Sequence, residues 1–235
     1  MNLATIAAAS QRAQAAYIDA PEKARAAFEA LGLCFIDLYQ NASHQAALSQ
    51  SADGKLFLSI SGTRFSQGKI GDLFDDMDLA PVDVGMGAQV TRGAYEGLSD
   101  MWQWALDTAP AESVFNVEGH SLGGWRATYT PLFIPVRRIG MLHAFEPPKG
   151  ANAAYYARFQ TELAGLVIVG QGRDIWFGYP RLGEWIHRPG PMLWIKSSGY
   201  SVIDTQDWPG GLNLADHSID LAAQRLVALS ETATQ

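Results

Sequence analysis

Residues 119–124 read Gly119-His120-Ser121-Leu122-Gly123-Gly124, so that Ser121 stands at the centre of a G-x-S-x-G pattern. The pattern belongs to a sharp turn between a strand and a helix, where small residues two positions before and after the serine let the backbone bend and expose the hydroxyl. The flanks fit, because 113–118 has the β-branched and aromatic content of a buried strand and 122–133 favours a helix whose last turn is disturbed by Pro131. We therefore interpret Ser121 as a nucleophile; the alternative is a glycine-rich turn whose serine only caps a helix.

The composition indicates one globular domain over residues 1–235, since 48% of the residues are apolar and the length suits a single core. The formal net charge is −7, and lysines and arginines do not cluster. Nucleic acid and anionic membrane surfaces are therefore not expected as principal partners. No obligate protein partner is implied.

The chain start, residues 1–10, lacks the basic region and the long apolar region of a secretory signal. No stretch reaches the roughly 18 to 20 apolar residues that a membrane span needs. We expect a cytoplasmic protein, with export by a nonclassical route or a trimmed mature form left open. The single cysteine, Cys34, lies in the apolar run 31–36 and is expected in the core.

Hydrophobic periodicity predicts an α/β fold with a mostly parallel central sheet, an antiparallel hairpin near the N-terminus and helices on both faces. The hairpin is indicated by Asp53-Gly54, a strong turn signal between two apolar runs. The expected helices are 13–31 (interrupted at Pro21), 90–106, 122–133, 152–163 and 218–229, and the expected strands are 33–39, 45–51, 55–61, 113–118, 139–145, 166–169 and 192–195.

A serine hydroxyl needs a base within hydrogen-bonding reach and a carboxylate that orients this base. We predict His217 as the base, because residues 213–217 form a short loop before the last helix, at the edge where the strands end. His187 is the second choice. His44, His120 and His143 are interpreted as structural.

The orienting carboxylate is expected after a strand and between the serine and the histidine in chain order, as in α/β-hydrolases. Asp174 fits best, because it follows the apolar run 166–170. Asp204 and Asp207 are substitutes, whereas Asp216 is interpreted as a helix N-cap. Trp176, in the aromatic loop after Asp174, is either a wall of an acyl pocket or a core residue.

Two backbone N–H groups are expected to stabilise an oxyanion. Leu122 follows the serine and supplies the first. Thr63 supplies the second, because Ser61-Gly62-Thr63 ends a strand in a glycine turn. The alternative for this segment is a turn that only terminates the strand.

No cofactor and no metal are expected. The chain has no phosphate-binding glycine loop and no histidine and cysteine set with zinc spacing. The acidic cluster of Asp72, Asp75, Asp76 and Asp78 lacks the EF-hand spacing, so it is interpreted as a solvated loop with cap residues.

With these residues placed, the chain resembles the fungal-type triacylglycerol lipase family, the class 3 lipases of the α/β-hydrolase superfamily, from the first hairpin to the last helix. The resemblance rests on several local matches: Ser61-Gly62-Thr63 as oxyanion turn, the acidic segment 71–78, the stretch 90–95, the G-H-S-L-G-G of 119–124, Asp174-Ile175 with Pro180, residues 187–190, and Asp216-His217.

The resemblance implies a mobile lid over residues 64–73, with Phe65 among its lipid-facing side chains, and transient contact with a lipid interface. The chain departs from the family at Ser61, where an arginine is usual, at Trp125-Arg126, where small residues are common, and over 145–150, which matches the family's loop only loosely.

The expected activity is that of a serine carboxylic-ester hydrolase, a lipase or esterase that cleaves acylglycerols or similar esters. Two alternatives stay open. One is deacylation of phospholipids or galactolipids, or acyl transfer, by the same three residues. The other is a non-catalytic binding module on a hydrolase fold.

Overall fold

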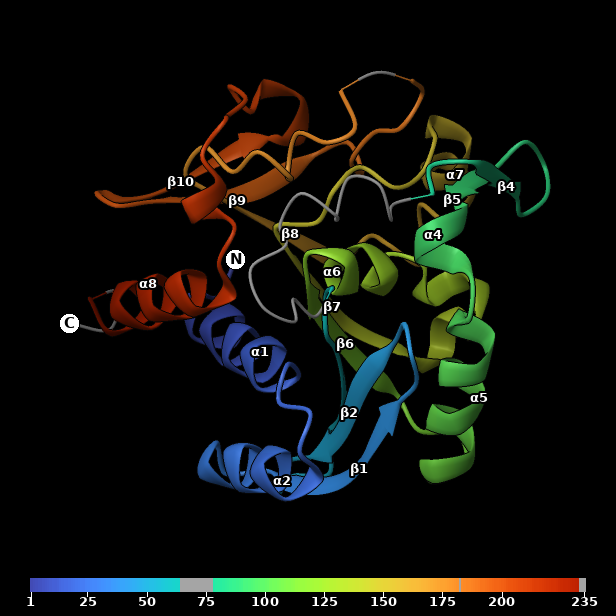
Figure 1. Ribbon diagram of the computed structural model, residues 1–235, viewed down its shortest axis with the longest axis vertical. Coiled ribbons are helices and arrows are strands. Elements are labelled where there is room, and N and C mark those ends of the chain that lie inside the picture. The colour runs from blue at the N-terminus through green and yellow to red at the C-terminus, as the bar shows by residue number, and fades with distance from the viewer. Residues whose placement is uncertain (64–77, 182, 233–235) are drawn as a thin grey trace.

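The computed structural model describes residues 1–63, 78–181 and 183–232 (Figure 1). Within them, one large sheet has the strand order β1-β2-β3-β6-β7-β8-β9-β10. The four central pairings, from β3–β6 to β8–β9, are parallel, and the pairings at both edges are antiparallel. The bounds are β1 (Cys34–Gln40), β2 (Gln45–Gln50), β3 (Leu56–Ile60), β6 (Phe115–His120), β7 (Ile139–Phe145), β8 (Leu166–Gln171), β9 (Pro191–Lys196) and β10 (Gly199–Asp204).

Helices cover both faces of the sheet, as the sequence predicts (Figure 1). α1 (Leu3–Ala15), α2 (Pro21–Ala30) and α8 (Ile219–Thr232) lie on one face, and α5 (Leu98–Thr108), α6 (Leu122–Ala127) and α7 (Ala153–Arg158) lie on the other. The strands supply both cores because successive side chains point to opposite faces. Phe145 packs with α1 and α8, whereas Ala144 belongs to the other core. The predicted α/β architecture is confirmed.

The predicted helix 90–106 is wrong in its first half. Residues 89–91 form β5 (Gln89–Thr91), which pairs with β4 (Pro81–Asp83), and two helices follow, α4 (Arg92–Tyr95) and α5. Gly97 separates them with a φ of 77°, a left-handed conformation that suits glycine and ends helical geometry. The apolar spacing of 98–106 does form α5, whereas the part of the pattern before the glycine divides into the end of β5 and the short helix α4.

Several other boundaries differ from the sequence-based prediction. α6 ends at Ala127, and a 3₁₀ turn, η1 (Thr130–Leu132), contains Pro131. The edge strand β10 was missed because its exposed Tyr200 and Val202 alternate with partly buried residues in a short, polar stretch. Cys34 was expected in the core but is exposed at the start of β1. The apolar residues around it did not predict on which side of the strand its own side chain lies.

A buried ion pair fastens α1 to the centre of the sheet. The Arg12 guanidinium donates to both carboxylate oxygens of Glu118, at 2.9 and 3.1 Å, and neither residue is appreciably exposed. The hydroxyl of Ser59 donates to the same carboxylate. Removing one partner would leave a buried charge without a partner, so the pair fixes where α1 lies. None of the helices in the described residues is both long enough and apolar enough to cross a membrane.

Two buried histidines make stability fall in mild acid. Burial lowers the pKa of both His143 and His187 from 6.5 to about 4. The unfolded chain therefore binds these protons at a higher pH than the folded chain, and stability is lost as the pH falls from about 6.5 towards 4. Each histidine is expected to contribute on the order of 2 kcal/mol to the loss between pH 7.5 and pH 5.

We expect His143→Gln to flatten this dependence. Thermal unfolding of the native protein and of the variant, followed at pH 7.5 and pH 5, should show a smaller fall in unfolding temperature for the variant. Parallel curves would contradict the assignment.

Candidate active site

Ser121 lies in a strained turn between β6 and α6, with φ 57° and ψ −126°. Close backbone packing forces this turn. A Cβ on Gly119 would lie 2.3 Å from the Gly123 backbone, and a Cβ on Gly123 would lie 2.2 Å from the carbonyl oxygen of Ile60. Only glycine fits at these two positions, so the turn has the geometry that the G-x-S-x-G pattern predicts.

The side chains of Ser121, His217 and Asp174 lie in one hydrogen-bonded line. The His217 Nε2 atom is 2.8 Å from the Ser121 Oγ, and the Nδ1 atom is 2.9 Å from Asp174 Oδ2. The other carboxylate oxygen, Oδ1, accepts the backbone N–H of Trp176 at 2.8 Å. Asp174 is fully buried and Ser121 is 6% exposed. With Nδ1–H donated to the carboxylate, Nε2 is free to accept the serine proton.

The loops that carry Asp174 and His217 are joined to each other. The Asn213 N–H donates to the carbonyl of Arg173 at 2.9 Å, and the Gln171 amide donates to the carbonyl of Asp216 at 2.7 Å. The Asp216 carboxylate accepts the Arg173 N–H at 2.9 Å, so it joins the loops and does not cap α8. The interpretation of Asp216 as an N-cap is therefore wrong; the Ser218 hydroxyl accepts the Leu221 N–H instead.

The two predicted oxyanion donors border the serine. A Cβ on Gly62 would lie 2.9 Å from the Ser121 Cβ, which places the 61–63 turn directly against the nucleophile. Thr63 is the next residue along the chain. Leu122 is the first residue of α6, where a backbone N–H has no partner within its own helix.

Of the two predicted substrate contacts, Trp176 is described and Phe65 is not. Trp176 is 1% exposed, and its ring centroid is 6.2 Å from that of His217. It packs behind the histidine in this structure. Phe65 and the predicted lid, 64–73, lie outside the described residues, as do three of the four acidic residues 72–78; the fourth, Asp78, pairs with Arg92.

The remaining candidates lie elsewhere in the fold. His187, the second choice for the base, is buried and stacks on Phe177, whose carbonyl it contacts at 2.8 Å through Nε2. His143 lies within β7, and His44 is buried beside Gly97. Asp204 accepts the Gln206 N–H in a local turn.

Sequence reasoning missed two polar residues, Glu146 beside His217 and Tyr17 beside His120, and undervalued His120 itself. Glu146 lies 3.6 Å from His217 Nδ1 and 3.0 Å from the Nε2 atom of His120, whose Nδ1 atom lies 2.7 Å from the Tyr17 hydroxyl. A glutamate at the end of the apolar strand 139–145 was the available signal for Glu146. Tyr17 follows the first helix and carries no such signal.

Burial sets the protonation states of this group. It raises the pKa of Glu146 well above the usual range, and the neighbouring charges of Asp174 and Asp216 raise it further. It also lowers the pKa of His120, with His217 adding to the effect. For both groups, burial thus disfavours the charged form.

One set of side chains in the described part of the chain has donors close enough for a metal ion: His120, Glu146 and His217, with ligand atoms within 4.8 Å of one another. Both ring nitrogens of both histidines already have hydrogen-bond partners. A metal at this place would displace Asp174 or Ser121 from His217, so the arrangement suits proton transfer better than metal binding.

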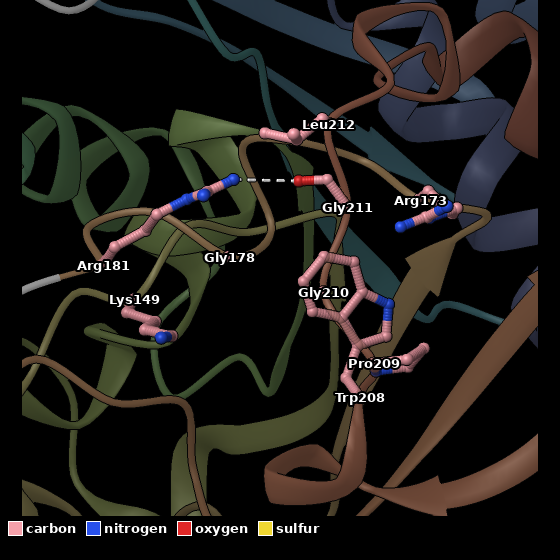
Figure 2. A pocket seen from close by; sticks show the side chains of 9 residues that line it. All are labelled: Lys149, Arg173, Gly178, Arg181, Trp208, Pro209, Gly210, Gly211 and Leu212. Atoms are coloured by element: carbon pink, nitrogen blue, oxygen red, sulfur yellow. Dashed lines mark hydrogen bonds between the residues drawn. The ribbon is translucent and has the colours of Figure 1, made fainter.

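A cavity of about 430 Å³ borders the loops that carry Asp174 and His217 (Figure 2). Its cations are Lys149, Arg173 and Arg181, and its walls include Trp208 and the glycine-rich backbone 209–212. Arg181 donates to the carbonyl of Gly211 at 3.0 Å, as Figure 2 shows. Burial and the Arg181 charge lower the pKa of Lys149. No carboxylate among the described residues forms an ion pair with these three cations.

Comparison with protein-family models and with curated protein sequences finds no match. Solved structures do match. A lipase from Rhizopus microsporus var. chinensis has a TM-score of 0.73 and 17% identity, over 92% of this chain and 85% of that one. Lipase II from Rhizopus niveus has a TM-score of 0.71 and 17% identity, over 92% of each chain. A triacylglycerol lipase from Penicillium expansum has a TM-score of 0.65 and 14% identity, over 92% and 88%. The chain therefore has the α/β-hydrolase fold in the form found in these lipases.

Proposed function

We propose that the protein is a serine carboxylic-ester hydrolase that cleaves acylglycerols or similar acyl esters through an acyl-enzyme on Ser121. One observation carries the proposal: the imidazole of His217 lies between the Ser121 hydroxyl, at 2.8 Å, and the buried Asp174 carboxylate, at 2.9 Å. The likeness in fold to lipases from Rhizopus and Penicillium supports an ester as the substrate.

In the first half-reaction the Ser121 Oγ attacks the acyl carbonyl carbon while His217 Nε2 takes the hydroxyl proton. Asp174 holds the imidazole in the tautomer with Nδ1–H and stabilises the imidazolium that forms. The carbonyl oxygen becomes an oxyanion, for which the N–H groups of Thr63 and Leu122 are the proposed donors. The tetrahedral intermediate then collapses, and His217 returns the proton to the departing alcohol.

In the second half-reaction a water molecule attacks the acyl-serine carbonyl and gives its proton to His217. Collapse of this intermediate releases the carboxylic acid and restores the Ser121 hydroxyl. The strained backbone at Ser121 serves both steps, because it presents Oγ beside the oxyanion turn before substrate arrives.

Polar-lipid deacylation is a second candidate function, favoured by the cation-lined cavity of Figure 2. An anionic headgroup held by Lys149 and Arg181 would lie next to the loops of the proposed acid and base. The phosphate of a glycerophospholipid fits this chemistry, because guanidinium and ammonium groups donate charge-assisted hydrogen bonds to phosphate oxygens.

We expect the native protein to be labelled covalently by a fluorophosphonate and to hydrolyse p-nitrophenyl esters. Ser121→Ala should abolish both, because the attacking oxygen is gone. Asp174→Asn should lower kcat by about 10⁴-fold, since the wrong histidine tautomer is then favoured. A series of acyl lengths, with and without micelles, separates a short-chain esterase from a lipase.

Ser230→Ala, at the far end of α8, is the matched control and should be labelled like the native protein. A folded native protein that takes up no label would overturn the proposed function.

The headgroup site is tested with the double variant Lys149→Gln/Arg181→Gln. We expect its kcat/KM for a short-chain phosphatidylglycerol to fall about 10-fold, in line with the loss of charge-assisted hydrogen bonds. Its kcat/KM for a triacylglycerol of the same acyl length should stay within about twofold of the native value. Arg137→Gln, which removes an exposed cation elsewhere, is the control. Equal losses on both substrates would exclude phosphate recognition at this cavity.

A further inference from the structure

A chain of polar groups connects the oxyanion turn to the proposed base through the interior of the protein. It begins at the Tyr17 hydroxyl, which packs against the oxyanion turn: a Cβ on Gly62 would lie 2.3 Å from the hydroxyl oxygen. That hydroxyl lies 2.7 Å from His120 Nδ1, and His120 Nε2 lies 3.0 Å from Glu146 Oε2. The same Glu146 oxygen is 3.6 Å from His217 Nδ1.

We propose that Tyr17, His120 and Glu146 are positioning residues that hold the oxyanion turn and the catalytic histidine in fixed relation to each other. The inference rests on the proposed function, because it concerns the same site. It assigns a role to three side chains that neither attack the substrate nor contact the oxyanion.

One assignment of protons satisfies the two side-chain contacts of His120. We assign the Tyr17 hydroxyl proton to the 2.7 Å contact with His120 Nδ1, next to the close approach of the Gly62 backbone to the same hydroxyl. A neutral imidazole that accepts at Nδ1 carries its proton on Nε2, so His120 donates to Glu146. Each link thus fixes the direction of the next.

Glu146 supports His217 without replacing Asp174. Burial and the Asp174 charge raise the pKa of the Glu146 carboxyl and so disfavour its charged form. Its oxygen also lies 0.7 Å farther from His217 Nδ1 than the Asp174 oxygen does (3.6 against 2.9 Å). The histidine proton therefore goes to Asp174. Glu146 and the His120 ring both lie against the His217 imidazole, and the centroids of the two histidine rings are 4.8 Å apart.

The backbone holds Glu146 in place for this role. Its φ is 49°, an uncommon value for a residue with a side chain, and its N–H donates to the Val169 carbonyl at 2.7 Å. This bend at the end of β7 turns a fully buried carboxyl towards the site. Strain of this kind persists where the surroundings fix it, and it clusters at functional sites.

The test compares variants on a soluble p-nitrophenyl ester. Tyr17→Phe and Glu146→Leu should each lower kcat by about 10-fold or more, since small misplacements of catalytic groups have effects of up to 10²-fold, while KM stays within about twofold. Glu146→Gln should keep most of the native kcat, because its amide oxygen still accepts the His120 Nε2–H. The double variant Tyr17→Phe/Glu146→Leu should lose little more than the worse single variant, because one chain is broken twice.

Tyr155→Phe is the matched control. It also removes a buried hydroxyl, one that donates to the Thr128 carbonyl at 2.8 Å, but it lies outside the chain and should leave kcat unchanged. A folded Tyr17→Phe protein with the kcat of Tyr155→Phe would overturn the proposal, as would a Glu146→Gln protein as slow as Glu146→Leu. Fluorophosphonate labelling of the native protein separates the two levels: without labelling the proposed function fails, whereas with labelling and normal Tyr17→Phe activity only the positioning role fails.

Discussion

The close approach of three backbone segments at Ser121 is the constraint on which the rest of the site depends. The end of β3, the end of β6 and the start of α6 meet at distances that exclude any side chain at Gly119 and Gly123. Because these glycines leave no room, the serine adopts a positive φ and its N–H bonds the Phe145 carbonyl. The same contact places the 61–63 turn against Ser121, so one packing arrangement positions both the proposed nucleophile and a proposed oxyanion donor.

The first helix, α1, also supports the site from its own face of the sheet. Arg12 bonds Glu118 on β6, two residues before His120, and thereby fixes the helix under the sheet. Tyr17 follows that helix, and its hydroxyl contacts His120 at the end of the same strand. The structural ion pair and the proposed positioning residues thus meet the same strand, two residues apart, at Glu118 and His120.

The sequence predicted those features that depend on local patterns. The glycines around Ser121, the apolar strands 139–145 and 166–169 and the Asp-Gly hairpin each have a short-range signal, and all appear in the structure, the second strand with two further residues. The predicted Ser121, Asp174 and His217 side chains also lie together. What could not be predicted depends on contacts between distant segments. Tyr17 meets His120 across 103 positions of the chain, and no local pattern reports such a meeting. The prediction of one helix over 90–106 was wrong because Gly97 interrupts a pattern that apolar spacing alone would continue.

α1 is more than a cover for the sheet, and this limits how the protein can be shortened. A fragment that starts at β1 would keep every strand and all three residues of the Ser-His-Asp line, and by inspection of its sequence it would look complete. It would nevertheless lack the cation that neutralises Glu118 and the hydroxyl that faces His120. A shortened chain that is meant to keep the proposed site therefore needs to retain Arg12 and Tyr17, which lie ahead of β1 in the sequence.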